Sequence, residues 1–260
     1  MRFRWLGVLP ALLLVAIAGW EIAATWRAAT SVPDDVAWAR AAKVVRAGYR
    51  PGDLIVFAPA WVDPVGRMHL GDLIPLEMAA RMDAARYGRI WELSIRGARS
   101  PDTRGLSPVE TTDLGVTVRR FERAPATILA DVRERIATAK SGGATPRVEL
   151  TEVGYAPHRC ILIVPQPGKP ARLTFPQLPL GRELVGYVGI ADAFTRRDDR
   201  TPVKLGVEIA GKPVASATAG VDDGWVRFAA TTAPGAADVT FVATATRPGR
   251  QLCFAVEARQ

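Results

Sequence analysis

The chain has 260 residues, which is enough for one or two domains with sizeable cores. Hydrophobic residues make up 48% of it and charged residues 23%, values typical of a folded globular protein rather than a disordered one. The formal net charge is +8, but the arginines are spread along the chain without a dense basic block. Nucleic-acid-binding surfaces concentrate their positive charge, so this distribution argues against a nucleic-acid partner.

The N-terminus has the composition of a membrane-targeting segment. Two arginines, Arg2 and Arg4, precede a long apolar run, and positive charge in this place keeps the N-terminus in the cytoplasm. The span from Trp5 to Trp26 reaches the ~20 residues that cross a bilayer, which favours an uncleaved single-pass anchor in the inner membrane. Ala16-Ile17-Ala18 is a small-x-small pattern that signal peptidase could cut, so a secreted or periplasmic protein is the alternative. In both cases the rest of the chain is exported.

Residues 31–145 are expected to form an open α/β sheet domain. The apolar run Leu54 to Phe57 opens at a Pro-Gly turn and ends before Pro59. A strand that is apolar on both faces is typical of a parallel sheet with helices on each side. Helices alternating with strands support the same architecture. The expected helices are 36–46, 73–86 and 126–140, and the expected strands are 54–57, 89–94 and 115–119.

The segment Trp61 to Asp72, which follows the first expected strand as a loop, is the candidate site. In parallel α/β sheets, ligands bind beyond the carboxyl ends of the strands, where this segment begins. Trp61 could stack on a sugar ring, and Arg67 could make a bidentate contact with an anion such as a sugar phosphate. Asp63, His69 and Asp72 are weak candidates for acid/base catalysis. In the competing interpretation the aspartates serve turns and caps, and the tryptophan packs on the sheet.

Three patterns in this half resemble a known family. They are Arg-Pro-Gly-Asp with its apolar strand at 50–59, Arg-x-Trp at 89–94 and Val-Arg-Arg-Phe at 118–121. Together they resemble the extracytoplasmic domain of membrane glycosyltransferases that use polyprenyl-phosphate sugars, of the mannosyltransferase-like and aminoarabinose-transferase-like kinds. The resemblance implies a shared soluble module, with a lipid-linked sugar or a membrane protein as partner. Those enzymes carry their catalytic acidic residues in a multi-helix membrane part that this chain lacks, which puts catalysis in doubt.

From Arg147 onward the sequence indicates an all-β domain. Short runs rich in Val, Ile, Phe and Thr are separated by Pro and Gly turns at the ~8–12-residue spacing of a β-sandwich. The order Leu-x-Gly-Tyr-Val-Gly, Val-x-Leu-x-Val and Gly-Trp-x-x-Phe resembles galactose-binding-like and carbohydrate-binding jelly rolls, which implies a jelly-roll-like sandwich. The expected strands are 148–153, 160–164, 171–175, 183–190, 203–209, 214–219, 225–231, 238–245 and 252–258. The expected domain ranges are 1–30, 31–145 and 146–260.

Three residues of the second half are singled out. Trp225 could stack on a sugar at an edge of the sandwich, although an aromatic residue at this kind of position is also typical of a core. Cys160 and Cys253 are the only cysteines, and both fall on expected strands of an exported domain. An oxidising compartment favours a disulfide between them if the strands are neighbours, and two buried thiols are the alternative.

Common catalytic patterns are absent: Gly-x-Ser-x-Gly, Gly-x-x-x-x-Gly-Lys-Ser/Thr, Gly-x-Gly-x-x-Gly and His-Glu-x-x-His. The two histidines form no spaced His/Cys pair, and we expect no metal and no cofactor. The expected function is that of a membrane-anchored, exported, non-catalytic accessory or carbohydrate-binding protein in glycan or cell-envelope polymer metabolism. The alternatives are an enzyme acting on a glycan or lipid-linked sugar, and a scaffold for a membrane glycosyltransferase.

Overall fold

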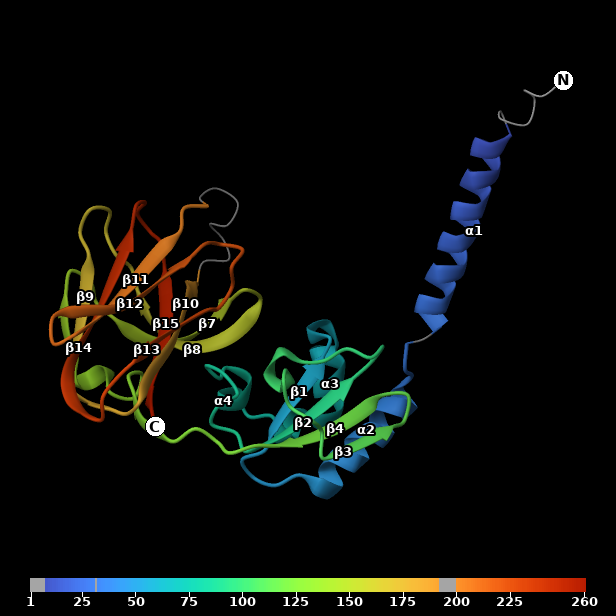
Figure 1. The fold of residues 1–260 in the computed structure, drawn as a ribbon, viewed down its shortest axis with the longest axis horizontal. Helices are drawn as coiled ribbons and strands as arrows, with labels where there is room; N and C mark the ends of the chain where they lie inside the picture. The colour runs from blue at the N-terminus through green and yellow to red at the C-terminus, as the bar shows by residue number, and fades with distance from the viewer. Residues whose placement is uncertain (1–7, 31, 192–199) are drawn as a thin grey trace. The chain divides into compact units, whose positions relative to one another are not determined.

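A computed structural model describes residues 8–30, 32–191 and 200–260 (Figure 1). The chain divides into two compact units. Unit 1 comprises Met1–Asp72 and Arg89–Glu122, and unit 2 comprises Leu73–Gly88 and Arg123–Gln260. The expected domain ranges 31–145 and 146–260 stay a prediction about independent folding. In the structure, the segments 73–88 and 123–145 belong with the C-terminal unit.

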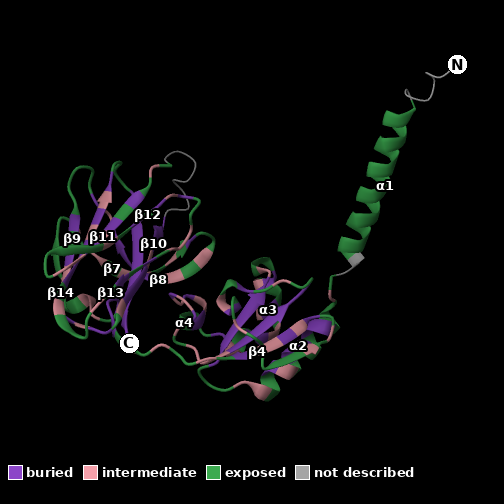
Figure 2. Cartoon of the chain, viewed as in Figure 1, coloured by how far each residue is buried: buried purple, intermediate pink, exposed green. Residues whose placement is uncertain are grey.

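The N-terminal apolar segment is the helix α1 (Leu9–Thr30), and the side chains along its described part are exposed (Figure 2). The stretch Leu9–Ala29 has a mean hydropathy of 1.6 and is long enough to cross a membrane. A membrane anchor and a signal peptide both have this length and composition.

Unit 1 contains a four-stranded sheet in the order β1-β2-β4-β3. Strands β1 (Leu54–Ala58) and β2 (Arg89–Ser94) are parallel, whereas β4 (Thr117–Glu122) and β3 (Glu110–Asp113) join in antiparallel fashion. The sheet is therefore mixed, with a single parallel pair, rather than largely parallel. Its helical elements are α2 (Asp35–Gly48), η1 (Ala60–Val62), α3 (Asp63–Leu70), η2 (Gly71–Leu73) and η3 (Pro101–Thr103).

The strand β1 is buried along its whole length, as its apolar run indicates. On one face, the ring of Phe57 packs on Trp38 of α2 and on Gly66 of α3. On the other face, a loop with the single turn η3 supplies Thr103, whose hydroxyl donates to the buried carboxylate of Glu92. The expectation of helices on both sides of the strand is wrong, because hydrogen bonds to Glu92 hold a loop there instead.

Unit 2 contains a β-sandwich, as expected. One sheet has the order β13-β10-β15-β8-β7, with β5 added beside β15, and the other has the order β12-β11-β14-β9-β6. The core lies between them, where the rings of Phe241 and Phe254 come from opposite sheets with centroids 5.1 Å apart. The strands are β5 (Ile128–Asp131), β6 (Lys140–Gly142), β7 (Arg147–Val153), β8 (Ala156–Ile163), β9 (Ala171–Leu180), β10 (Glu183–Ile190), β11 (Val203–Ile209), β12 (Lys212–Ala219), β13 (Val226–Thr231), β14 (Gly235–Ala245) and β15 (Leu252–Arg259).

The helix expected over 126–140 is wrong. Strand β15 pairs with β8 only through Leu252–Phe254, and the backbone groups of its last residues need another partner. Strand β5 supplies it, with Ala258 opposite Ala130. Ala130 and Val132 then point into the sandwich core at the two-residue period of a strand. Long-range pairing overrides the helical spacing of the apolar residues.

The helix expected over 73–86 is also wrong, because only the single turn α4 (Leu76–Ala79) is helical. We call Leu73–Gly88 the strap, since it lies on the outer face of the β10-β15-β8 sheet. Its backbone carbonyls are used by the sandwich: Ala80 accepts from the Arg159 amide at 3.1 Å, and Met82 accepts from the Trp225 indole at 3.1 Å. Carbonyls engaged in this way are not available to an α-helix.

We predict that Gly66→Ala loosens unit 1. A Cβ at this position would lie 1.9 Å from Cε1 of the buried Phe57 ring, and relieving such overpacking costs about 1–3 kcal/mol. Gly71→Ala is the matched control, because its Cβ has nothing within 4 Å and its φ of −60° suits alanine. Amide hydrogen exchange of β1 and β2 should be faster in Gly66→Ala only. Equal protection in both variants would contradict the packing described here.

Candidate functional site

The segment Trp61 to Asp72, expected as a loop, is mostly the helix α3 with a 3-10 turn on each side. The Trp61 side chain is 60% exposed, and the Arg96 guanidinium lies 5.9 Å from its ring centroid. Arg67 forms a two-contact ion pair with Asp63 one helical turn earlier, with Nη2 and Oδ1 3.1 Å apart. The arginine proposed for anion binding therefore already has a carboxylate partner.

The other acid/base candidates of this segment also have partners. Asp72 accepts two hydrogen bonds of 2.7 Å from Arg46, and these hold the pKa of the Asp72 carboxyl below its ordinary value. His69 Nε2 lies 3.1 Å from a carboxylate oxygen of Asp35, close enough for an ion pair but without hydrogen-bond geometry. Asp63, His69 and Asp72 thus each face a different partner, and the arrangement resembles helix and turn stabilisation more than a catalytic cluster.

Trp225 lies on the outer face of the sandwich, under the strap. Its ring stacks on His158 at 4.4 Å between centroids and on Tyr187 at 5.9 Å. Its indole N–H donates to the carbonyl of Met82, whose side chain packs with Val185 of β10 and Ala255 of β15. The side chain is half-buried, and its polar atom is already used by the strap.

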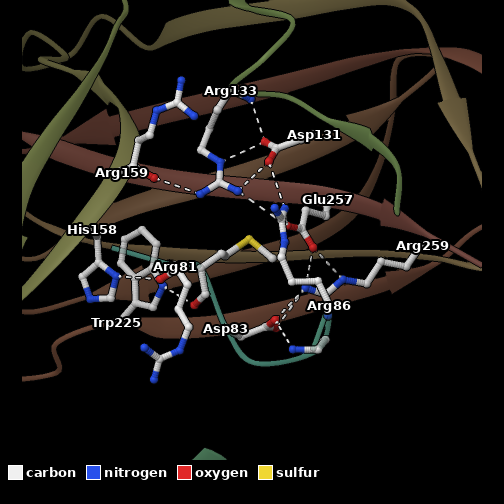
Figure 3. Close-up of polar contacts among 12 residues, drawn as sticks. Arg81, Asp83, Arg86, Asp131, Arg133, His158, Arg159, Trp225, Glu257 and Arg259 are labelled. Atoms are coloured by element: carbon white, nitrogen blue, oxygen red, sulfur yellow. Dashed lines mark hydrogen bonds and ion pairs between the residues drawn. The ribbon is translucent and has the colours of Figure 1, made fainter. Parts of the chain in front are cut away.

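The strap is fixed by an ion cluster (Figure 3). Glu257 of β15 is 1% exposed and accepts from Arg259 at 2.7 Å and from Arg86 of the strap. Arg259 in turn donates to both oxygens of Asp83, also on the strap, at 2.9 Å. Arg133 donates to the buried Asp131 at 2.9 Å. Buried charges need this degree of pairing to be tolerated, so we interpret the cluster as structural.

Cys160 of β8 and Cys253 of β15 form a disulfide with Cα atoms 5.6 Å apart. Both residues are fully buried on the outer face of this sheet with Leu162, and the half-buried Trp225 packs against them. The bond joins adjacent strands beneath the region that the strap and Trp225 cover. Within residues 8–30, 32–191 and 200–260, no group of three or more His, Cys, Asp or Glu side chains is arranged to hold a metal ion.

The outer face of the other sheet is open and hollowed. Two neighbouring hollows, of about 460 and 510 Å³, share Lys204 and Thr244. The larger lies over β11, β12 and β14, and the smaller lies at the ends of these strands, where the loop 166–170 also lines it. We call them together the β11 groove. Their lining includes Lys204, Gly206, Glu208, Val214, Ser216, Thr218, Val242 and Thr244.

Strand register explains the shape of the β11 groove. Residues paired across strands share a face, so Thr218, Lys204 and Thr244 form one row across the sheet. Ser216, Gly206 and Val242 form the next row. Gly206, in the middle of this row, carries no side chain. A depression therefore lies between the hydroxyl of Ser216 and the aliphatic side chain of Val242.

The sequence reasoning missed both features of unit 2. The local pattern predicts a helix over the strap, and no local pattern signals that this segment docks on the sandwich. The β11 groove could have been found, because the outward positions 204, 206 and 208 alternate with the buried Val203, Leu205 and Val207 on a strand whose limits were expected correctly. The sequence does not indicate which of the two outer faces of the sandwich the strap covers.

No protein-family model matches the chain, and no curated protein matches it. Solved structures that match part of the chain include a carbohydrate-binding module of Cellvibrio mixtus lichenase 5A in complex with cellotriose, at 13% identity and TM-score 0.34 over 52% of this chain and 98% of that one. Another is a xylan-binding domain from Paenibacillus barcinonensis, at 15% identity and TM-score 0.34 over 51% and 94%.

A third is a Clostridium perfringens structure of a carbohydrate-binding module with GlcNAc and further domains, at 14% identity and TM-score 0.38 over 56% of this chain. The match spans 35% of that chain, and two related structures are matched over 29% and 20% of theirs. These neighbours are carbohydrate-binding modules or contain them. The glycosyltransferase resemblance of residues 50–121 stays a prediction.

We predict that the stability of unit 2 depends on pH through His158, which contacts the strap. Burial lowers the pKa of His158 to about 4, and its Nδ1–H donates to the Arg81 carbonyl at 3.3 Å. Below the ordinary histidine pKa of about 6.5, His158 is protonated in the unfolded chain but stays neutral in the folded chain. Stability should therefore fall as the pH drops from about 6.5 towards 4, by up to a few kcal/mol at about 1.4 kcal/mol per pKa unit.

The measurement is urea unfolding followed by near-ultraviolet circular dichroism between about pH 7 and pH 5. His158→Gln removes the titration and should flatten this part of the stability profile. His69→Gln is the control, since it leaves the His158 titration in place and should keep the slope. An unchanged slope in His158→Gln would show that His158 does not carry the effect.

Proposed function

We propose that the chain is a membrane-anchored, extracytoplasmic, non-catalytic protein whose sandwich binds a cell-envelope glycan along the β11 groove. The observation that carries the proposal is the contrast between the two outer faces of the sandwich. The strap covers the face that bears Trp225, through Met82, Asp83 and Arg86. The other face is open over β11, β12 and β14 and is hollowed at Gly206.

The chemistry of the β11 groove suits a sugar. Ser216 and Thr218 offer hydroxyl groups that can donate and accept, Thr244 donates to the Lys204 carbonyl and can still accept, and the Lys204 side chain offers donors only. Val242 provides an aliphatic surface for the C–H face of a sugar ring. A hollow of about 510 Å³ is within the ~300–1,000 Å³ of small-molecule sites. Among the described residues, neither hollow has an aromatic side chain in its lining, so we expect weak binding of one sugar unit and avidity from a polymer.

The ion pairs of unit 1 favour binding over catalysis. Asp63 is paired with Arg67, and Asp72 with Arg46, which leaves neither carboxylate poised as a general acid or base. Of the three ligand-binding candidates from the sequence, Trp61 is exposed, whereas Arg67 and Trp225 are engaged within the fold. An enzyme acting on a lipid-linked sugar is therefore the weaker candidate.

The neighbours in complex with cellotriose and GlcNAc give the glycan role a precedent on a similar sandwich, but the proposal rests on the groove itself. A role as scaffold for a membrane glycosyltransferase has only the sequence resemblance of residues 50–121 in its favour.

We predict that filling the β11 groove abolishes glycan binding. Gly206→Leu suits this purpose, because the nearest atom to its Cβ would be Val242 Cβ at an ordinary 3.8 Å. Ala229→Leu adds the same side chain at an exposed position of β13, in the other sheet, and is the matched control. The full chain in nanodiscs is applied to an array of cell-envelope polysaccharides together with cellotriose and xylan. Binding that survives Gly206→Leu would contradict the β11 groove as the binding site. No binding by the unmodified chain would contradict the glycan-binding function.

We also predict that α1 is retained in the mature protein. Its apolar length matches a bilayer span, and Trp20 and Trp26 are exposed towards one end, as interfacial aromatics of an anchor are. Intact-mass measurement of the membrane-extracted protein should include the N-terminal segment. A mature chain that begins just after Ala18 would instead identify a cleaved signal peptide.

A further inference from the structure

The helix α3 and the turn before it are apolar on two opposite sides. The buried side holds Val62, Gly66 and Leu70, which pack on the sheet. A surface helix normally has one such stripe and a polar opposite side. Here the opposite side is exposed and also apolar, and we call it the α3 apolar face: Trp61, Pro64, Val65 and Met68.

These four positions fall on one side because they are spaced by three or four residues along the helical segment. Trp61 is 60% exposed, Val65 38% and Met68 80%. Single exposed hydrophobic residues are ordinary, whereas a contiguous apolar patch marks a contact with another surface. The charged residues Asp63 and Arg67 flank this patch and pair with each other.

Two observations connect the α3 apolar face to the end of α1. The Arg96 guanidinium lies over the Trp61 ring at 5.9 Å and also donates to the carbonyl of Ala28, in the last turn of α1. In addition, α1 ends at Thr30 and α2 begins at Asp35. At ~3.6 Å per residue this link reaches at most about 18 Å, so unit 1 stays close to the surface that α1 leaves.

We propose that the α3 apolar face docks on the lipid surface of the membrane that α1 spans. The proposal rests on the membrane anchoring proposed above. Trp61 would take the interfacial depth that suits tryptophan, level with Trp26 at the end of α1, while Val65 and Met68 enter the upper acyl region. Arg96, at the border of the patch, is placed to reach a lipid phosphate.

The docked face orients unit 1 on the membrane. A single helix followed by a short link would let the unit rotate freely, whereas a second contact at α3 restricts it to one orientation. Unit 1 would then be a fixed base at the membrane surface.

The experiment places an environment-sensitive nitrobenzoxadiazole label at Met68→Cys in the full chain, reconstituted in phosphatidylethanolamine and phosphatidylglycerol vesicles. Met68 is 80% exposed, so the substitution leaves the core untouched, and the native cysteines are bonded to each other. Thr111→Cys is the matched control, because it is exposed on β3, the strand at the opposite edge of the sheet from β1. Quenching is measured with nitroxide-bearing lipids and with aqueous iodide, and carbonate extraction tests the anchor separately.

We expect the label at position 68 to be quenched several-fold more by lipid nitroxides, and several-fold less by iodide, than the label at position 111. Equal behaviour of the two labels in a chain that resists carbonate would overturn the docking and leave the anchor intact. Protection of position 68 from iodide without lipid quenching would mean that protein covers the face, and would also overturn the proposal. Release of the chain by carbonate would overturn the anchor itself.

Discussion

Pairing of the buried carboxylate of Glu257 is the constraint on which unit 2 depends. Strand β15 is buried along its entire length, so the outward-facing Glu257 and Arg259 lie under the strap rather than in water. A buried charge that loses its partner costs about 3–5 kcal/mol, and the partners here come from the strap, through Asp83 and Arg86, and from the sandwich. The strap therefore belongs to the folded unit, and its removal would expose the aromatic and disulfide-bearing face beneath it.

This constraint gives the two sheets of the sandwich different roles. The strap covers the outer face of the sheet that contains β15, and its carbonyls at Ala80 and Met82 accept hydrogen bonds from the sandwich. The sheet that contains β11 presents hydroxyl, cationic and aliphatic side chains in the groove on its outer face. A rigid sandwich can present that face without moving, which suits recognition better than catalysis. In the proposed account, the α3 apolar face contacts the membrane, and the β11 groove contacts the glycan.

Local patterns, namely short runs of Val, Ile, Phe and Thr between Pro and Gly turns, were enough to predict the sandwich strands β7 to β15, and β10 and β11 have the expected limits. The same reasoning failed at 126–140, where Ile128, Ala130 and Val132 fit a strand period as well as a helical one. The segment forms a strand because it pairs with the end of β15 that β8 does not reach, and no local pattern in the sequence signals this long-range pairing. Among the site candidates, residue types indicated that Trp61 and Arg67 could meet a ligand, but only the structure shows that Arg67 is paired with Asp63 while Trp61 is exposed.

Methyl NMR of the valines in the full chain, during titration with the polysaccharide that binds best, tests the central claim most directly. Val242 and Val214 line the β11 groove, Val185 lies beneath the strap beside Met82, and Val65 lies on α3. The account predicts ligand-dependent shifts at Val242 and Val214 and none at the other two. Shifts at Val185 or Val65 with none at Val242 would contradict it and place the glycan on the other sheet or on unit 1.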